Sequence, residues 1–248
     1  MTSKQVMLIV AALLLGGCGL FPRPPADELA GPYPSRHVWA IVPLGNESGT
    51  QQADGAVLAD HLHRQLENAS NLDVLPVNRT IAAMNALQMS RVSDPAQAMH
   101  LMRTLGVDGL VVGTVTAYDP YDPPKLGLTL ELYVDQRVDS VDAASIRRLR
   151  TSATDPAPAV QTPASRRQPV TVASAVLDAG DPRVRELLEY YASQRGPVLE
   201  KDAWRRYRIS MDLYSEFAAY VMSRRLLEAE RQRVAPPTSA ANEKPPTP

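Results

Sequence analysis

A run of alternating leucines in the middle of the chain places the strongest constraint on the fold. The leucines stand at every second position, with small, polar or aromatic residues between them: Leu126, Leu128, Leu130 and Leu132. Successive side chains of a β-strand point to opposite faces of a sheet, so this spacing predicts a strand over 126–133. Its leucine face must lie against a hydrophobic core.

The other segments alternate between strand and helix patterns. Strands are expected at 38–44, 72–77, 110–118 and 170–177, and helices at 54–68, 79–89, 95–105, from 182 onward and at 200–233. The third helix has clear ends, because Asp94 can cap it, Pro95 suits its first position and Gly106 can end it in a left-handed turn. This order predicts an α/β fold, with helices packed on a mixed sheet of about five strands and two further helices at the C-terminus.

The N-terminus has the pattern of a secretory signal peptide. Lys4 precedes an apolar run over 6–15, and small residues follow at Gly16 and Gly17 before Cys18. The run is too short for a helix that crosses about 30 Å of hydrocarbon. Cys18 is the only cysteine, which excludes an intrachain disulfide or a cysteine-cluster metal site.

The segment Leu15-Gly16-Gly17-Cys18 resembles the lipobox of bacterial lipoproteins. The resemblance implies removal of residues 1–17, a diacylglyceryl group on the Cys18 thiol and acylation of the new amino terminus. Three acyl chains would anchor the protein almost permanently. Gly19, instead of the Asp that retains some lipoproteins at the inner membrane, favours the periplasmic face of the outer membrane.

Three segments rich in proline or polar residues divide the mature chain. Residues 18–36 are expected to form a stiff, proline-rich tether, 138–168 an irregular insert and 234–248 a disordered, proline-rich tail. Between the tether and the tail, 37–233 is expected to form one α/β domain.

Two short motifs resemble known envelope domains. The residues Val42-Pro43-Leu44-Gly45-Asn46-Glu47-Ser48-Gly49 are similar to the strand and turn that open the TolB amino-terminal domain, the curli secretion lipoproteins and the LpoB-type activators of penicillin-binding proteins. The run Leu105-Gly106-Val107-Asp108-Gly109-Leu110-Val111-Val112-Gly113-Thr114-Val115 is similar to a later strand of the same families. The resemblance covers about 38–135 and the strand at 170–177, and it implies this fold and a role in interaction or assembly.

The connection after the strand at 110–118 is the most unusual surface segment. It holds two tyrosines and two carboxylates beside prolines: Tyr118, Asp119, Tyr121 and Asp122. These side chains are candidates for binding a protein partner, a basic peptide or a cation. The simpler interpretation is a rigid link between two strands.

Arginines mark two further candidate surfaces. Those of the insert are candidates for contact with anionic headgroups or envelope polymers: Arg147, Arg148, Arg150, Arg166 and Arg167. A solvated loop is the alternative. The last helix carries an aromatic stripe that is expected to be core, with Arg205, Arg206 and Arg208 on its wet side; a groove for a partner helix is the alternative.

The sequence contains no motif of a known catalytic or metal site. His61 and His63 stand two apart on an expected helix and project about 200° apart, so an intact helix cannot bring both to one metal. We expect these histidines at solvent-exposed or helix-flank positions. A total of 26 Lys and Arg against 27 Asp and Glu removes the electrostatic argument for nucleic-acid binding.

These patterns predict a non-enzymatic lipoprotein without a cofactor. It would be held in the membrane through Cys18, would bind an envelope protein, and could self-associate. A subunit of a curli-type secretion complex is one alternative, although the polar insert does not supply a membrane-spanning hairpin. A hydrolase acting on envelope polymers is the other.

Overall fold

The computed structural model describes residues 29–134, 169–195 and 202–235. Six strands form one sheet in the order β3-β1-β4-β5-β6, with the short β2 continuing beside β4. The strands are β1 His37–Ile41, β2 Gly45–Asn46, β3 Leu72–Val74, β4 Gly109–Asp119, β5 Lys125–Val134 and β6 Thr171–Asp178. Strands β1, β2 and β3 run parallel to their neighbours, whereas β4, β5 and β6 are antiparallel, so the predicted mixed sheet is confirmed.

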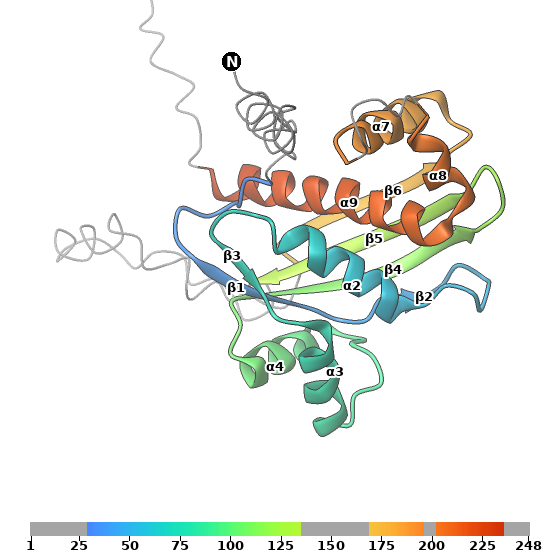
Figure 1. The fold of residues 1–248 in the computed structure, drawn as a ribbon. Coiled ribbons are helices and arrows are strands. Elements are labelled where there is room, and N and C mark those ends of the chain that lie inside the picture. The colour runs from blue at the N-terminus through green and yellow to red at the C-terminus, as the bar shows by residue number, and fades with distance from the viewer. Residues whose placement is uncertain (1–28, 135–168, 196–201, 236–248) are drawn as a thin grey trace, which may run out of the picture.

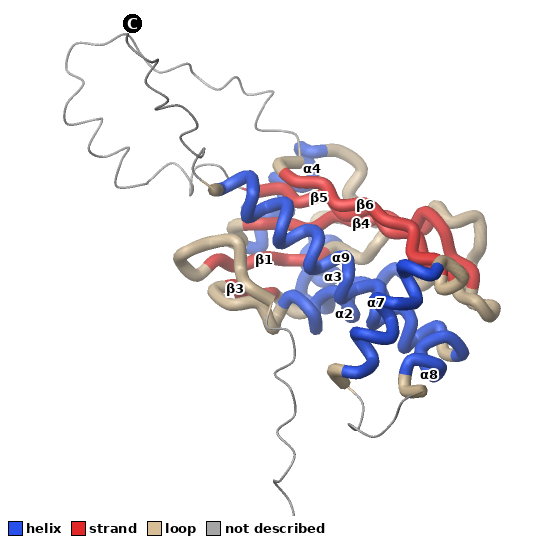
Figure 2. Tube along the Cα trace, turned by 90° about the horizontal axis from the view of Figure 1, so that it is seen from above, coloured by secondary structure: helices blue, strands red, loops and turns tan. Residues whose placement is uncertain are grey.

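Helices cover the two faces of the sheet unequally (Figure 1). The helices are α2 Gly55–Leu66, α3 Val77–Ala86, α4 Pro95–Leu105, α7 Pro182–Ser193, α8 Trp204–Ile209 and α9 Met211–Val234. In Figure 1, α2, α7, α8 and α9 lie above the sheet, and α3 and α4 lie below its parallel half. Among the described residues, no helix covers the lower face of β6, and Val172 and Val176 of this strand are exposed. Figure 2 shows the same layers from above, with α9 crossing β5 and β6.

The predicted strand at 126–133 behaves as its alternation requires. All four leucines are buried in the upper core, together with Trp39 of β1 and Phe217 of α9. Glycine at 109 makes room for that tryptophan, because a Cβ there would lie 2.5 Å from Trp39 Cδ1. The smaller lower core joins Val42 and Tyr133 to residues of α3 and α4.

The ends of α4 also match the sequence expectation. The Asp94 carboxylate accepts a hydrogen bond from the Gln97 backbone N–H at 2.9 Å, and Pro95 begins the helix. Gly106 ends it in the left-handed region, at φ 67°. These ends depend on local chemistry alone, which explains why the sequence located them.

The C-terminal helices differ from expectation at one residue. The sequence predicted a continuous helix over 200–233, but Ser210 has an extended backbone that separates α8 from α9. Its hydroxyl caps α9 by accepting from the Leu213 N–H at 3.4 Å. Most of the predicted stripe is core, since Tyr207, Tyr214, Ala218 and Val221 are buried, whereas Trp204 and Met211 are half-buried.

The N-terminal segment also differs from expectation. Residues 29–36, assigned to the tether from their prolines, pack on the domain: Leu29 and Tyr33 are buried, and Leu29 forms a parallel bridge with Ala69. The Arg36 guanidinium binds the Asp73 carboxylate. The folded unit therefore begins at or before Leu29. Cys18, the lipobox, the insert and the tail from 236 onward lie outside the described residues.

Candidate functional site

The predicted loop at 118–122 lies at one end of the domain, which we call the turn end: Asp119 at the end of β4, the β4–β5 connection 120–124, α8 and Ser210. The Asp119 carboxylate accepts from the Tyr121 backbone N–H at 3.1 Å, which holds the connection in a tight turn. Tyr121 itself is 74% exposed. The turn is thus ordered by Asp119, and its tyrosine is presented to solvent.

An ion pair joins this turn to α8. The Arg208 guanidinium donates to Asp122 Oδ1, with Nε at 2.9 Å. The carboxylate is half exposed, so water screens the pair and its contribution to stability is small. Its effect is geometric, because it fixes the β4–β5 connection beside α8.

Apolar and aromatic side chains flank that ion pair. Ile209, directly after Arg208, is 77% exposed, and it ends α8 where the chain bends at Ser210. Trp204 is half-buried, with the guanidinium carbons of Arg208 and Arg205 at 5.5 and 5.9 Å from its ring centroid. The turn end therefore places two exposed side chains, Tyr121 and Ile209, directly next to the two partners of the Asp122–Arg208 pair, with the half-buried Trp204 beside Arg208.

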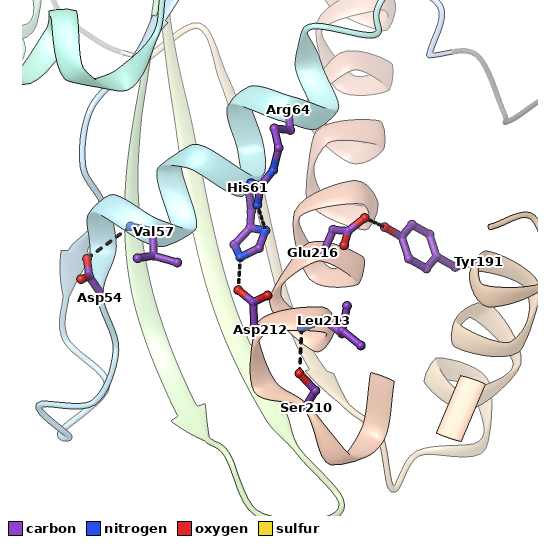
Figure 3. Close-up of polar contacts among 9 residues, drawn as sticks. All are labelled: Asp54, Val57, His61, Arg64, Tyr191, Ser210, Asp212, Leu213 and Glu216. Atoms are coloured by element: carbon purple, nitrogen blue, oxygen red, sulfur yellow. Dashed lines mark hydrogen bonds and ion pairs between the residues drawn. The ribbon is translucent and has the colours of Figure 1, made fainter. Parts of the chain in front are cut away.

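A polar cluster connects α2 to the start of α9 (Figure 3). His61 is 1% exposed, so the expectation of an exposed or helix-flank position was wrong for this residue. Its Nε2 lies 3.0 Å from Asp212 Oδ1, and its Nδ1 lies 2.6 Å from the Arg64 guanidinium. Arginine can only donate, so Nδ1 accepts and the neutral ring donates from Nε2 to Asp212.

The surroundings of His61 favour this neutral form. Burial lowers the pKa of His61 and the Arg64 charge lowers it further, while Asp212 and Glu216 oppose the shift. Both ring nitrogens are already bound, so His61 has no lone pair to offer a nucleophile or a metal. His63 turns to another element and lies 3.2 Å from the Val74 carbonyl oxygen through Nε2.

Glu216 extends the polar contacts towards α7. The Tyr191 hydroxyl donates to Glu216 Oε1 at 2.9 Å (Figure 3). Burial raises the pKa of Tyr191 and outweighs the opposing Arg195 charge, and the Glu216 charge raises it further, so the phenol stays protonated. Burial likewise raises the pKa of Tyr118, and the negative charge of Asp212 raises it further. Tyr118 is thus part of the packing behind the surface.

The opposite end of the domain, which we call the entry end, is organised around one buried carboxylate. Glu230 of α9 is completely buried and accepts from the Tyr33 hydroxyl at 2.6 Å and from Thr171. Arg233 also binds it, with Nε and Nη2 at 2.8 and 2.6 Å. Tyr33, Thr171 and Arg233 each stand within a few residues of the end of a described range. The Glu230 carboxylate therefore links the N-terminal segment, the start of β6 and the end of α9, each of which lies next to residues outside the described ranges.

The remaining predicted site residues divide by location. The arginines of the insert lie outside the described residues, as does Cys18. Among the residues that the structure describes, no group of three or more His, Cys, Asp or Glu side chains is placed to hold a metal ion. Within the same ranges, every helix is too short or too polar to cross a membrane.

No family model matches this chain, and no curated protein matches it. Several solved structures are similar to it in part. The lipoprotein GNA1162 from Neisseria meningitidis is 16% identical over 66% of this chain and 99% of its own, with a TM-score of 0.39. The LpoB C-terminal domain from Salmonella enterica is 14% identical over 51% of this chain and 82% of its own, with a TM-score of 0.34. A chain of the PelC dodecamer from Paraburkholderia phytofirmans is 18% identical over 42% of this chain and 66% of its own, with a TM-score of 0.28.

The sequence indicated the β4–β5 connection of the turn end but not the exposed residue at the end of α8. Tyr121 and Asp122 were conspicuous between prolines, but Ile209 looked like one more residue of a long helix. The available signal was Ser210, a good N-cap residue three positions before Leu213. Nothing local marks Glu230 as buried, because its partners lie up to 197 residues away in the chain.

Proposed function

We propose that this protein is a non-enzymatic interaction module of the bacterial cell envelope. It is anchored through acylated Cys18 in the periplasmic leaflet of the outer membrane, and it binds a protein partner with its turn end. The lipobox resemblance and Gly19 support the anchor and its location.

The exposed residues beside the Asp122–Arg208 ion pair are the observation that carries this proposal. Tyr121 and Ile209 are the two most exposed large apolar side chains of the described residues, and each is directly next to one partner of the pair. Tyrosine, tryptophan and arginine dominate the energetically important positions of protein interfaces. Exposing this combination without a partner would leave apolar surface in water for no structural gain.

The arrangement of the two ends suits an anchored module. The described chain begins at the entry end, and the ten residues of β5 span about 33 Å from there to the turn end. A protein tethered at the entry end would hold its turn end away from the membrane surface. Tyr121 and Ile209 would then face the space between membranes, where a partner can reach them.

The first experiment tests the partner. The acylated full-length protein is purified from its native membranes in mild detergent, and the mass and composition of the complex are measured. The double variant Tyr121→Ser/Ile209→Ser should lose the partner and keep its fold. The matched control is Val57→Ser/Val172→Ser, which removes two exposed apolar side chains elsewhere.

Each outcome has a clear meaning. A defined complex that the turn-end variant loses and the control keeps supports the proposal. A complex that both variants keep overturns the role of the turn end. A large complex of this chain alone favours a self-assembling secretion subunit, and a bare monomer contradicts the interaction role.

The second experiment tests the anchor. Cys18→Ser in the full chain should move the protein from the membrane fraction to the soluble fraction, because the serine hydroxyl cannot replace the thiol in the acylation step. A Cys18→Ser variant that stays with the membrane would contradict anchoring through this residue.

A further inference from the structure

A groove runs along the outer side of α9 between α7 and the N-terminal segment. Its volume is about 770 Å³. Leu187 and Tyr190 of α7 form one wall and are 43% and 44% exposed, although the other side of α7 is buried. Tyr220 of α9 also lines the groove, but it is 4% exposed and its ring lies against Arg195 and Arg224, so Tyr190 is the accessible aromatic ring.

The groove is also positively charged. Three arginines line it but only one acidic residue does: Arg224, Arg225, Arg231 and Glu228. Glu228 is already bound to Arg231 and to Gln232. Arg225 donates to a neutral group, the Ser174 carbonyl oxygen, at 3.3 Å. An occupant with negative charge and surfaces that pack on aromatic rings would therefore complement this groove.

The chain itself enters the domain at this groove. Leu29 and Ala30, the first two described residues, form part of its lining, and Arg231 donates to the Ala30 carbonyl oxygen at 2.7 Å. The residues directly upstream read Leu20-Phe21-Pro22-Arg23-Pro24-Pro25-Ala26-Asp27-Glu28. This segment ends with two carboxylates and holds three prolines and a phenylalanine before them.

We propose that residues 20–28 of the chain bind in the α7–α9 groove as an extended strap. Asp27 and Glu28 meet the arginine side, and the prolines pack on Tyr190 and Leu187. Proline-rich segments bind aromatic-lined grooves elsewhere because their extended conformation is preformed and little entropy is lost.

The length of the segment agrees with the length of the groove. Eight residues from Leu29 back to Phe21 reach about 25 Å in an extended proline-type helix. The groove follows α9 from Arg231 to Tyr220, which is about 16 Å along the helix axis. Phe21 can therefore reach Leu187 and Tyr190 without strain.

The C-terminal tail is the competing occupant within this chain. It follows Ala235, one turn beyond Arg231, and it also contains prolines. Its single Glu243 is balanced by Lys244, whereas residues 20–28 carry two acids against one arginine. Charge complementarity and the continuity with Leu29 favour the N-terminal segment.

Strap binding would set how far the domain stands from its anchor. This consequence rests on the proposed anchoring through Cys18, whereas the binding itself does not. With the strap in the groove, most of the residues between Cys18 and Leu29 cannot extend, so the entry end is held close to the membrane. Release of the strap would let the turn end reach further.

Disulfide trapping in the full-length protein tests the strap. Phe21→Cys is combined either with Leu187→Cys in the groove or with Glu67→Cys, an exposed site two residues from Ala69, which pairs with Leu29. An unbound segment would reach both sites, whereas a bound strap reaches the groove. We expect the Phe21–Leu187 pair to oxidise at least about tenfold faster than the Phe21–Glu67 pair, because binding raises the local thiol concentration. Leu187→Cys alone controls for reaction with Cys18.

A charge exchange tests the acidic contact. Asp27→Arg/Glu28→Arg should slow trapping at Leu187→Cys about tenfold, and adding Arg224→Glu/Arg225→Glu should restore it. Thermal unfolding of each variant confirms that the domain is intact. Equal rates at Leu187→Cys and Glu67→Cys would overturn the proposal. So would faster trapping from Ala240→Cys in the tail. Loss of the Tyr121–Ile209 partner would leave these rates unchanged, so the two proposals fail separately.

Discussion

The two ends of the domain differ in how their charged side chains are placed: one holds a buried carboxylate, and the other an exposed ion pair. At the entry end, the Glu230 carboxylate is completely buried and bound by Tyr33, Thr171 and Arg233. At the turn end, the Asp122–Arg208 pair is half exposed, and the side chains beside it point to water. A buried charge leaves a large penalty when its partners are lost, whereas an exposed pair does not. The charged group whose loss should destabilise the fold most is thus at the entry end, whereas the exposed side chains proposed for recognition are at the turn end.

The largest effect should come from Glu230. Glu230→Ala leaves the Tyr33 and Thr171 hydroxyls without their acceptor, and it removes the ion pair with Arg233. We expect the free energy of unfolding to fall by about 3 kcal/mol, measured by urea denaturation. Glu228→Ala, two residues earlier on the exposed side of α9, is the control and should cost about 1 kcal/mol or less. Equal losses of unfolding free energy in the two variants would show that the buried and the exposed carboxylate contribute equally to stability.

The turn end should respond in binding and not in stability. Tyr121→Ala and Ile209→Ala should each weaken the proposed partner complex about tenfold, as expected for exposed anchor residues of an interface. The free energy of unfolding should change by less than about 0.5 kcal/mol, because neither side chain is part of the core. Titration of the purified partner checks the first expectation, and thermal unfolding checks the second. A variant that unfolds would show that the turn end also supports the fold.

His61 should make stability depend on pH. Its folded-state pKa lies below the ordinary value of 6.5, so the folded protein binds fewer protons there than the unfolded chain. The contribution of neutral His61 to the free energy of unfolding is therefore fully present above pH 6.5, and it is lost as the pH falls through the folded-state pKa. His61→Gln should flatten the dependence of the unfolding free energy between about pH 5 and 7. An unchanged slope would show that other groups govern acid sensitivity.

The smallest effect should come from the ion pair of the turn end. Asp122→Asn should change the free energy of unfolding by less than about 1 kcal/mol, because water screens the pair. The same change should loosen the connection to α8, which hydrogen exchange of the Tyr121 and Ile209 amides would report. Unchanged exchange at both amides would show that the pair does not fix this surface.

The parts of the fold found from the sequence are those that depend on neighbours in the chain. The alternating leucines of β5 and the Asp94 and Gly106 ends of α4 all follow from local geometry. His61 is buried where α2 packs on α9, and its partner Asp212 is 151 residues away; Leu29 and Tyr33 share a core with α9. Prolines in 29–36 gave the same pattern as a free tether, because composition does not show whether a docking surface exists.

The position of α9 has a consequence for how the chain folds. The leucine face of β5 shares its core with α9, a helix that ends at Val234 and that also packs on α2, near the start of the domain. The core therefore cannot close until nearly the whole polypeptide has been synthesised, and contacts so distant in sequence form slowly. Until then the leucine stripe stays exposed, so a nascent chain of this protein remains a substrate for chaperones that keep polypeptides unfolded.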